Sequence, residues 1–473
     1  MFRTPITRRA SLWCRFVGCL LIGGVALLGT PAWGVQAQPP LAASQAIQAA
    51  LTTSAKAGTL DPTFGPGGSV ISDAAQSEYA QAMIVQADHK ILVAGYQNGS
   101  GNVPHFLLKR FDVSGQPDLS FGTGGRVVTA VRQAAVADQA LWVAVQPDGK
   151  ILVAGYVFNS SHHTDFALLR YTPVGTLDRS FGTQGKVITT VGDGFSPSGA
   201  HAVVVQPDGH ILVAGTAQSA SKASKVALLR YTAAGSLDPS FGDHGVTTTA
   251  FGAGTVSDAT TMALLKDGRI LVAGSTNSAS SPGGFALLRY LASGKLDPSF
   301  GKQGKVMTVV GLNSGDHAAV ARTVSVLPDG GILLAGSAWV TANGESAVNI
   351  GLAKYRADGS PDPSFGTGGN TVTTGSYGLG FQASTALPSG NFMVIGNVFT
   401  ADSTNDYSFL RYSREGNLDR TYGPDKNGVV SLEATESLFQ IASLFRQPDG
   451  KFVVAGSVDV KGVSHVVLAR FNP

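Results

Sequence analysis

Cysteine is almost absent from this 473-residue chain, which has only two, Cys14 and Cys19, both near the N-terminus. Residues 38–473 contain no thiol, and this excludes disulfides, zinc–thiolate sites and cysteine nucleophiles there. Charged residues make up 14% of the chain, where a soluble domain usually has about 25%. So low a fraction excludes a coiled coil and a charged disordered tail. Beyond the N-terminal segment, no run of 18 apolar residues predicts a transmembrane helix.

The first 37 residues have the features of a secretory signal peptide. Arginines at positions 3, 8, 9 and 15 precede or begin an apolar stretch, 16–28, that is too short for an ordinary membrane span. Small residues at 35–37 (Val-Gln-Ala) predict cleavage after Ala37. The Arg8-Arg9 pair loosely resembles a twin-arginine signal, but Ser11 stands where such signals prefer an apolar residue. Both export routes therefore stay open, and the mature protein is predicted to be periplasmic or extracellular.

Removal of this segment changes the charge balance of the chain. The net charge of +3 includes four arginines and no acids from residues 1–37, so the mature charge is near 3 − 4 = −1. The basic character of the whole chain therefore does not indicate a nucleic-acid partner. Residues 38–57 are rich in Ala, Gln, Ser and Thr. They are predicted to be a linker, either with a short helix from Leu41 to Ala50 or as a frayed end.

The rest of the chain consists of seven similar units. One block reads Leu/Pro-Asp-x-Ser/Thr-Phe/Tyr-Gly and recurs at intervals of 57 to 65 residues. A second reads Pro-Asp-Gly-x-Ile-Leu-Val-Ala-Gly, and a third is typified by Phe166-Ala-Leu-Leu-Arg-Tyr171. Three such blocks in every unit indicate one supersecondary motif repeated seven times.

Each unit is predicted to form four short strands. In the second unit the expected strands are 140–146, 151–154, 166–171 and 186–190. Pro147-Asp148-Gly149 between the first two predicts a tight hairpin turn, because proline presets φ and glycine accepts a positive φ. The continuous apolar run that follows is typical of a strand buried on both faces. No part of the unit has sustained helical periodicity.

Such units could stack as an open solenoid or close as a propeller. The first unit holds only the fourth strand, Ser69–Ser72, whereas the last unit stops after its third strand, Val466–Phe471. Pairing these two segments would remove an exposed sheet edge. The sequence therefore predicts an all-β, seven-bladed β-propeller of four-stranded blades over residues 58–473, closed by its N-terminal strand.

These blocks resemble the bacterial delta-60 repeat over roughly Leu60 to Pro473. The resemblance implies a β-propeller and an exported or surface protein, and it supplies no catalytic residues. Three units depart from the pattern, through Ala87-Asp88-His89, Pro388-Ser389-Gly390 and Tyr422.

The third block carries a basic residue on an apolar strand face, which calls for a charged partner. The aspartate of the first block is the acid present in every unit. The predicted structural pairs are Arg110–Asp118, Arg170–Asp178, Arg230–Asp238, Arg289–Asp297, Lys354–Asp362, Arg411–Asp419 and Arg470–Asp61. The aromatic residue of the same block is interpreted as a wedge between blades, with a ring of ligand-stacking aromatics as the alternative.

Few residues qualify as functional candidates. His162, His163 and Asp165 could bind a metal or act in acid–base chemistry, but they lie in a serine-rich stretch, and a solvated loop is the preferred interpretation. Trp339, placed in an enlarged loop of the fifth unit, is either a binding anchor or core packing. A calcium loop starting at Asp425 is rejected because Val429 breaks the ligand spacing. No nucleophile elbow, phosphate loop or zinc-protease motif occurs, and no catalytic residue, metal or cofactor is predicted.

The leading hypothesis is therefore an exported, non-enzymatic and monomeric propeller that acts as a scaffold or binding module. Its protein or glycan partner would contact the variable loops 97–105, 157–165 and 337–349. The alternative is a polysaccharide-directed hydrolase or lyase with its site on one propeller face. A third possibility is a divalent ion held structurally by loop carboxylates.

Overall fold

Residues that the computed structural model describes form 28 β-strands in seven four-stranded antiparallel sheets. These residues are 58–473 without 133–135, 160–162, 193–194, 220–222, 253–254, 279–280, 312–317, 343–344, 400–404, 424 and 433–438. The predicted signal peptide (1–37) and linker (38–57) lie outside the described residues. Two short 3-10 turns, η1 (Pro66–Gly68) and η2 (Ser100–Asn102), accompany the strands.

Each sheet is one blade, and its four strands follow one another from the innermost outwards. Blade 1 contains β2 (Glu78–Val85), β3 (Ile91–Asn98), β4 (Pro104–Phe111) and β5 (Arg126–Thr129). Blade 2 contains β6 (Asp138–Val145), β7 (Ile151–Phe158), β8 (Thr164–Tyr171) and β9 (Lys186–Thr189). Blade 3 contains β10 (Phe195–Val205), β11 (Ile211–Gln218), β12 (Ser224–Tyr231) and β13 (Val246–Thr249).

The remaining blades repeat this order. Blade 4 contains β14 (Val256–Leu264), β15 (Ile270–Ser278), β16 (Ser281–Tyr290) and β17 (Lys305–Thr308). Blade 5 contains β18 (Ala318–Val326), β19 (Ile332–Ala342), β20 (Glu345–Tyr355) and β21 (Asn370–Thr373). Blade 6 contains β22 (Leu379–Ala386), β23 (Phe392–Phe399), β24 (Asn405–Tyr412) and β25 (Val429–Leu432). Blade 7 contains β26 (Phe439–Arg446), β27 (Phe452–Val460), β28 (Val463–Phe471) and β1 (Ser69–Ile71).

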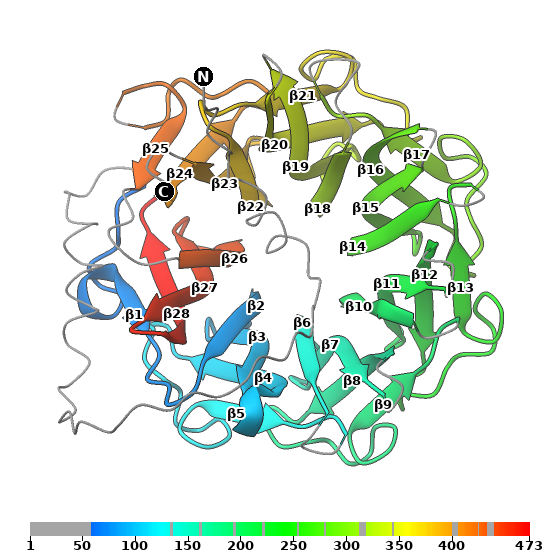
Figure 1. Cartoon of the computed structure of the whole chain (residues 1–473), viewed down its shortest axis with the longest axis vertical. Helices are drawn as coiled ribbons and strands as arrows, with labels where there is room; N and C mark the ends of the chain where they lie inside the picture. Colours follow the sequence, from blue (N-terminus) through cyan, green and yellow to red (C-terminus); the bar gives the residue numbers. More distant parts are fainter. Residues whose placement is uncertain are drawn as a thin grey trace, which may run out of the picture. The chain divides into compact units, whose positions relative to one another are not determined.

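The seven blades form a closed ring, as the sequence predicts. The innermost strands, β2, β6, β10, β14, β18, β22 and β26, contact one another in this order and back to β2 (Figure 1). Seven apolar clusters fill the ring, and each lies between two neighbouring blades. The core is therefore divided among the blade interfaces, and a blade cannot bury its apolar faces without both neighbours.

The ring is closed by strands from the two ends of the repeat region. β1 pairs antiparallel with β28, and Ser69, Val70 and Ile71 lie opposite Ala469, Leu468 and Val467. The Ser72 amide continues the ladder with a hydrogen bond to the Val466 carbonyl. This arrangement confirms the predicted closure and covers the edge that β28 would otherwise expose.

In six of the seven blades, the glycine that ends the second-strand block lies against a bulge in the neighbouring strand. In blade 2, an extra residue bulges out of β6 between Ala140 and Trp142. A Cβ atom on Gly155 would come within 2.0 Å of the Gln139 carbonyl oxygen. Only glycine lets the two backbones approach so closely.

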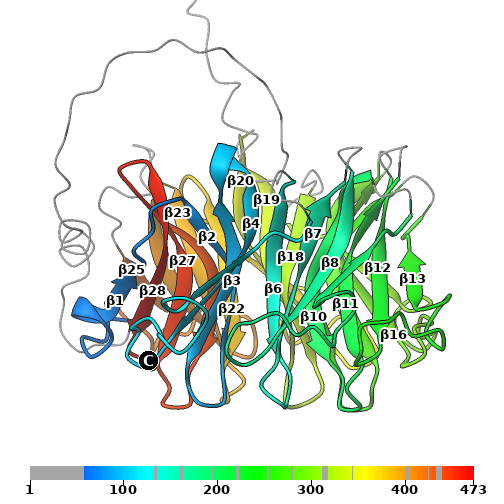
Figure 2. The same cartoon turned by 90° about the horizontal axis from the view of Figure 1, so that it is seen from below.

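The strands run between two faces of the ring (Figure 2). The turns between first and second strands, and the loops between third and fourth strands, lie at one end, which we call the repeat face. The connections from second to third strand and from one blade to the next lie at the other end, the variable face.

Two elements differ from the expected ones. β7 continues to Phe158 rather than ending at Ala154, because the whole stretch pairs with β8. Trp339, predicted to be in a loop, lies within β19 and pairs with both Ala318 and Val348.

Candidate functional site

The repeated basic and acidic residues come together in all seven units. The distances between the basic nitrogen and the aspartate Oδ2 are 2.8 Å for Arg110–Asp118, 2.9 Å for Arg170–Asp178, 2.7 Å for Arg230–Asp238, 2.8 Å for Arg289–Asp297, 3.0 Å for Lys354–Asp362, 2.8 Å for Arg411–Asp419 and 2.7 Å for Arg470–Asp61. These pairs lie at the repeat face. The last of them joins residues from opposite ends of the repeat region.

Five of the arginine pairs also reach the following blade, as blade 2 illustrates. Arg170 Nε contacts Asp178, Nη2 donates to Ser180 Oγ, and Nη1 donates to the Ala233 carbonyl in blade 3. Hydrogen bonds from Ser180, together with the charge of Arg170, lower the pKa of Asp178 to about 2. The aspartate is therefore ionised at neutral pH and holds the arginine in position, which is a structural use of both groups.

The repeated aromatic residue completes this arrangement. Phe181 is fully buried, and the Arg170 guanidinium lies 4.4 Å from its ring centroid. The ring also packs against Gly235 of blade 3. The equivalent side chains Phe64, Phe121, Phe241, Phe300, Phe365 and Tyr422 are buried as well. A ligand therefore cannot stack on them, and we call each set of basic residue, aspartate and aromatic a blade lock.

The other candidates from the sequence do not form a site. His162 lies outside the described residues. The backbone N–H of His163 donates to Asn159 Oδ1 in the connection between β7 and β8. Asp165 is buried on β8, where Arg132 Nη2 lies 2.5 Å from Oδ2 and Thr190 donates to Oδ1. Its carboxylate is therefore committed to internal partners.

Charged residues that break the repeat are buried in blade 1. Glu78 is fully buried and accepts a hydrogen bond from Lys109 Nζ, another from Ser72 Oγ at 3.0 Å, and has Arg126 Nε at 3.1 Å. Burial lowers the pKa of Lys109, and the carboxylate of Glu78 opposes this shift. Leu410 occupies the position of Lys109 in blade 6. This ion pair was missed from the sequence, although a lysine in a repeated apolar position was its signal.

A second buried polar pair lies between blades 1 and 2. His105 Nδ1 is 3.2 Å from Asp138 Oδ2, and Asp138 also accepts the backbone N–H groups of Phe106 and Val131. Burial raises the pKa of Asp138, which is fully buried. These contacts satisfy the carboxylate and leave no oxygen facing solvent, so the pair stabilises the blade interface.

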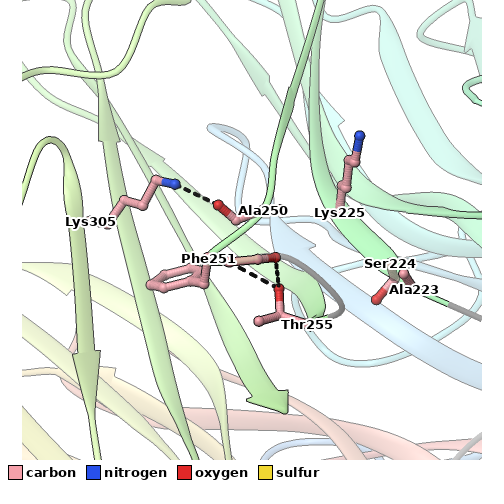
Figure 3. A pocket seen from close by; sticks show the side chains of 8 residues that line it. Ala223, Ser224, Lys225, Ala250, Phe251, Thr255 and Lys305 are labelled. Carbon is pink, nitrogen blue, oxygen red and sulfur yellow. Dashed lines mark hydrogen bonds between the residues drawn. The ribbon is translucent and has the colours of Figure 1, made fainter.

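An open pocket occurs instead between blades 3 and 4. It has a volume of about 340 Å³ and is lined by Ala223, Ser224, Lys225, Ala250, Phe251, Gly252, Thr255 and Lys305. Lys225 and Lys305 lie on opposite sides of it, with Phe251 and Thr255 between them (Figure 3). We call this cavity the two-lysine pocket.

The two lysine side chains of this pocket differ in their contacts with the protein. Lys305 Nζ donates to the Ala250 carbonyl and lies 6.0 Å from the Phe251 ring centroid. Lys225 is exposed and has no hydrogen bond or ion pair with another described residue. No described residue of the lining is acidic. The pocket therefore offers two ammonium groups and an aromatic face to a ligand of negative charge.

The equivalent position between blades 1 and 2 shows how the two-lysine pocket differs from the rest of the ring. Lys186 occupies the position of Lys305 and likewise donates to backbone carbonyls, those of Ala130 and Val131. His105 replaces Lys225, but it is held by Asp138. The two-lysine pocket has no local sequence signal, because its residues come from a strand, a connection and the next blade. Alignment of the seven units would have shown Lys225 as a departure.

Two further observations limit the kinds of site present. Among described residues, no three His, Cys, Asp or Glu side chains are grouped so that they could hold a metal ion. The described part of the chain also has no helix long and apolar enough to cross a membrane.

The fold and the seven blade locks define this chain as a seven-bladed β-propeller built from one repeat. Six segments match the family described as a beta-propeller domain of unknown function, DUF5122. They are residues 86–121, 146–181, 206–241, 265–300, 327–365 and 447–473. This match supports a propeller repeat family, whereas the resemblance to the delta-60 repeat stays a prediction.

Similar solved structures include an ulvan lyase of polysaccharide lyase family PL25, bound to -[GlcA(1-4)Rha3S]-. It is 10% identical, has a TM-score of 0.50, and the match covers 84% of this chain and 94% of the lyase. A protein of unknown function from Dyadobacter fermentans DSM 18053 is 12% identical with a TM-score of 0.40, covering 85% and 97% of the two chains. At these identities the similarity concerns the fold alone. No curated protein matches the chain.

Proposed function

We propose that this chain is an exported binding propeller whose two-lysine pocket recognises an acidic saccharide. The observation that carries the proposal is the pair of lysines from neighbouring blades around one cavity without an acidic described residue in its lining. The blade locks account for the repeated charged residues, so a ligand must be sought where the repeat is broken. Export rests on the predicted signal peptide at residues 1–37.

The chemistry of the pocket favours a sugar acid over a simple anion. The ammonium groups of Lys225 and Lys305 suit a carboxylate or sulfate group. Phe251 offers an aromatic surface to the C–H face of a sugar ring. The Ser224 and Thr255 hydroxyls donate to Asp258 and to the Gly252 carbonyl, so recognition rests on the two lysines and the aromatic ring. A volume of about 340 Å³ lies at the small end of ligand sites and fits one or two rings.

Binding is favoured over catalysis for a specific reason. Glycoside hydrolysis requires two carboxyl groups across the bond to be cleaved, and the described lining of the two-lysine pocket contains neither a carboxylate nor an imidazole. The polysaccharide-directed enzyme remains the competing hypothesis, and it predicts product formation where the binding module predicts none.

Calorimetric titration of the mature chain with hexuronate oligosaccharides and with neutral oligosaccharides of equal length would test this function. The acidic series is expected to bind, and Lys225→Gln or Lys305→Gln should each weaken binding about tenfold, because a hydrogen bond to a charged group contributes about 1.5 kcal/mol or more. Lys186→Gln is the matched control and should leave the affinity unchanged.

Equal binding of both series, or unchanged affinity in the two pocket variants, would contradict the proposed function. The same incubations should be assayed for new reducing ends and for unsaturated products. Steady formation of either product by the wild-type chain would favour the enzyme.

A further inference from the structure

The innermost strand of every blade has one bulge residue. The residues before and after it pair with two consecutive residues of the second strand, so the bulge residue itself has no pairing partner. The seven bulge residues are Gln81, Leu141, His201, Thr260, Arg322, Gln382 and Ala442. The backbone feature is thus repeated around the ring, but the side chain it presents differs from blade to blade. Repeated geometry with varied chemistry is the pattern expected of a binding position.

Two of these residues connect neighbouring innermost strands. His201 Nδ1 lies 2.7 Å from the Ala259 carbonyl oxygen, which belongs to β14. The Thr260 hydroxyl similarly donates to the Ala321 carbonyl of β18. In blades 3 and 4, the bulge side chain therefore closes a lateral contact to the next blade.

Arg322, the bulge residue of β18, makes no such contact. Its side chain is exposed, and no carboxylate of the described residues forms an ion pair with it. Desolvation lowers the pKa of Arg322. Because β14 and β22 flank β18, the solvent that reaches Arg322 is the solvent at the axis of the ring (Figure 1).

The charge of Arg322 also acts on a histidine two blades away. His201 is on β10, and β14 lies between it and β18 (Figure 1). Burial is the main cause of the lowered pKa of His201; the positive charge of Arg322 lowers it further, whereas the Ala259 carbonyl and the charge of Asp258 oppose the shift.

We propose that Arg322 is the anchor of an oxyanion-binding site at the axis of the propeller. The planar guanidinium suits a carboxylate, sulfate or phosphate group, which it can bind through two parallel hydrogen bonds. Because Arg322 is exposed and no carboxylate of the described residues pairs with it, its guanidinium is available to an anion from solution. This site is separate from the two-lysine pocket, because none of the residues that line that pocket is a bulge residue.

The test measures sulfate and phosphate binding at constant ionic strength, with chloride as the reference anion. The mature chain is compared with Arg322→Gln, both alone and in the Lys225→Gln/Lys305→Gln background, which removes the cations of the pocket. Arg179→Gln, an exposed arginine in a loop of the repeat face, is the control. Arg322→Gln should weaken binding at least tenfold, whereas the control and the pocket variants should not.

A second readout follows His201 by nuclear magnetic resonance of labelled histidine. A bound anion cancels the charge of Arg322 and should therefore raise the pKa of His201 in the wild-type chain but not in Arg322→Gln. Folding of the variant is checked by its circular dichroism spectrum without added anion.

Hexuronate oligosaccharides form the third arm, in the background that lacks the pocket lysines. Binding of free sulfate or phosphate identifies a small-ion site, whereas binding of the oligosaccharide alone identifies an acidic group on a larger ligand. Equal affinity in Arg322→Gln, or no binding of any of these anions by the wild-type chain, would overturn the proposal.

Discussion

The buried ion pair of blade 1 can be replaced by the apolar pair that blade 6 has at the same positions. Each single replacement should lower the unfolding free energy, and the double replacement should restore it. Glu78 and Lys109 are both buried and hydrogen-bonded to one another. Blade 6 has Leu379 and Leu410 at the equivalent positions, both buried. The chain thus contains its own example of an apolar solution on the same backbone.

The magnitudes follow from what each variant leaves behind. Lys109→Leu leaves Glu78 buried with only Ser72 and the partly exposed Arg126 as partners, and loss of one partner of a buried pair costs about 3–5 kcal/mol. Glu78→Leu leaves the Lys109 ammonium buried and should cost a similar amount. The double variant removes both desolvated charges, so its unfolding free energy should lie between the wild-type value and about 4 kcal/mol above it.

Urea unfolding of the four proteins gives the coupling free energy of a double-mutant cycle. Leu410→Lys in blade 6 is the matched control, because it creates a buried lysine without a carboxylate and should destabilise the ring. The reasoning would be refuted if the double variant were destabilised by the sum of the two single effects.

Three further predictions concern the blade locks and the closure of the ring. Phe181→Ala should lower the unfolding free energy by about 3–5 kcal/mol, because the ring is fully buried, and Phe158→Ala, at a partly exposed ring, should cost clearly less in the same urea titration. Deletion of residues 60–72 should lower the melting temperature far more than deletion of 38–57, because only the former removes the strand that closes blade 7. The pKa of Asp178 is about 2, below its ordinary value, so its contribution to stability is present above about pH 4 and is lost as the pH falls toward 2. Asp178→Asn should therefore flatten the acid limb of the stability–pH curve, and the exposed Asp243→Asn should leave it unchanged.

The ring itself could be predicted because its evidence is repeated seven times. Pairing of β1 with β28 followed from the strand missing in the first unit and the strand unpaired in the last. Strand lengths were harder, since Phe158 and Trp339 lie in parts of hairpins where polar and apolar residues do not alternate clearly. In both places the backbone ladder continues, and hydrogen bonding between neighbours extends strands beyond their apolar pattern.

The two-lysine pocket could not be predicted in the same way. Phe251 lies in the connection between blades 3 and 4, Lys225 begins the third strand of blade 3, and Lys305 begins the fourth strand of blade 4. Their proximity depends on the angle between adjacent blades, which no local pattern contains. Candidates chosen as a cluster in sequence were less informative, as Asp165 shows, because it is held inside the protein by Arg132.

The repeat provides an internal comparison that divides the ring into two sectors. At one position near the variable end of the innermost strand, blades 1 to 4 have the buried polar residues Glu78, Asp138, Ser198 and Ser257. Blades 5 and 6 have Ala319 and Leu379 there. Each of the four is hydrogen-bonded inside the protein, so the free-energy cost of burying it is offset. The two-lysine pocket lies in that same sector, and the bulge residue Arg322 lies on the first blade beyond it. Ligand binding is therefore expected over blades 3 to 5, which carry the pocket and Arg322, and variants of blades 6 and 7 should change stability without changing affinity.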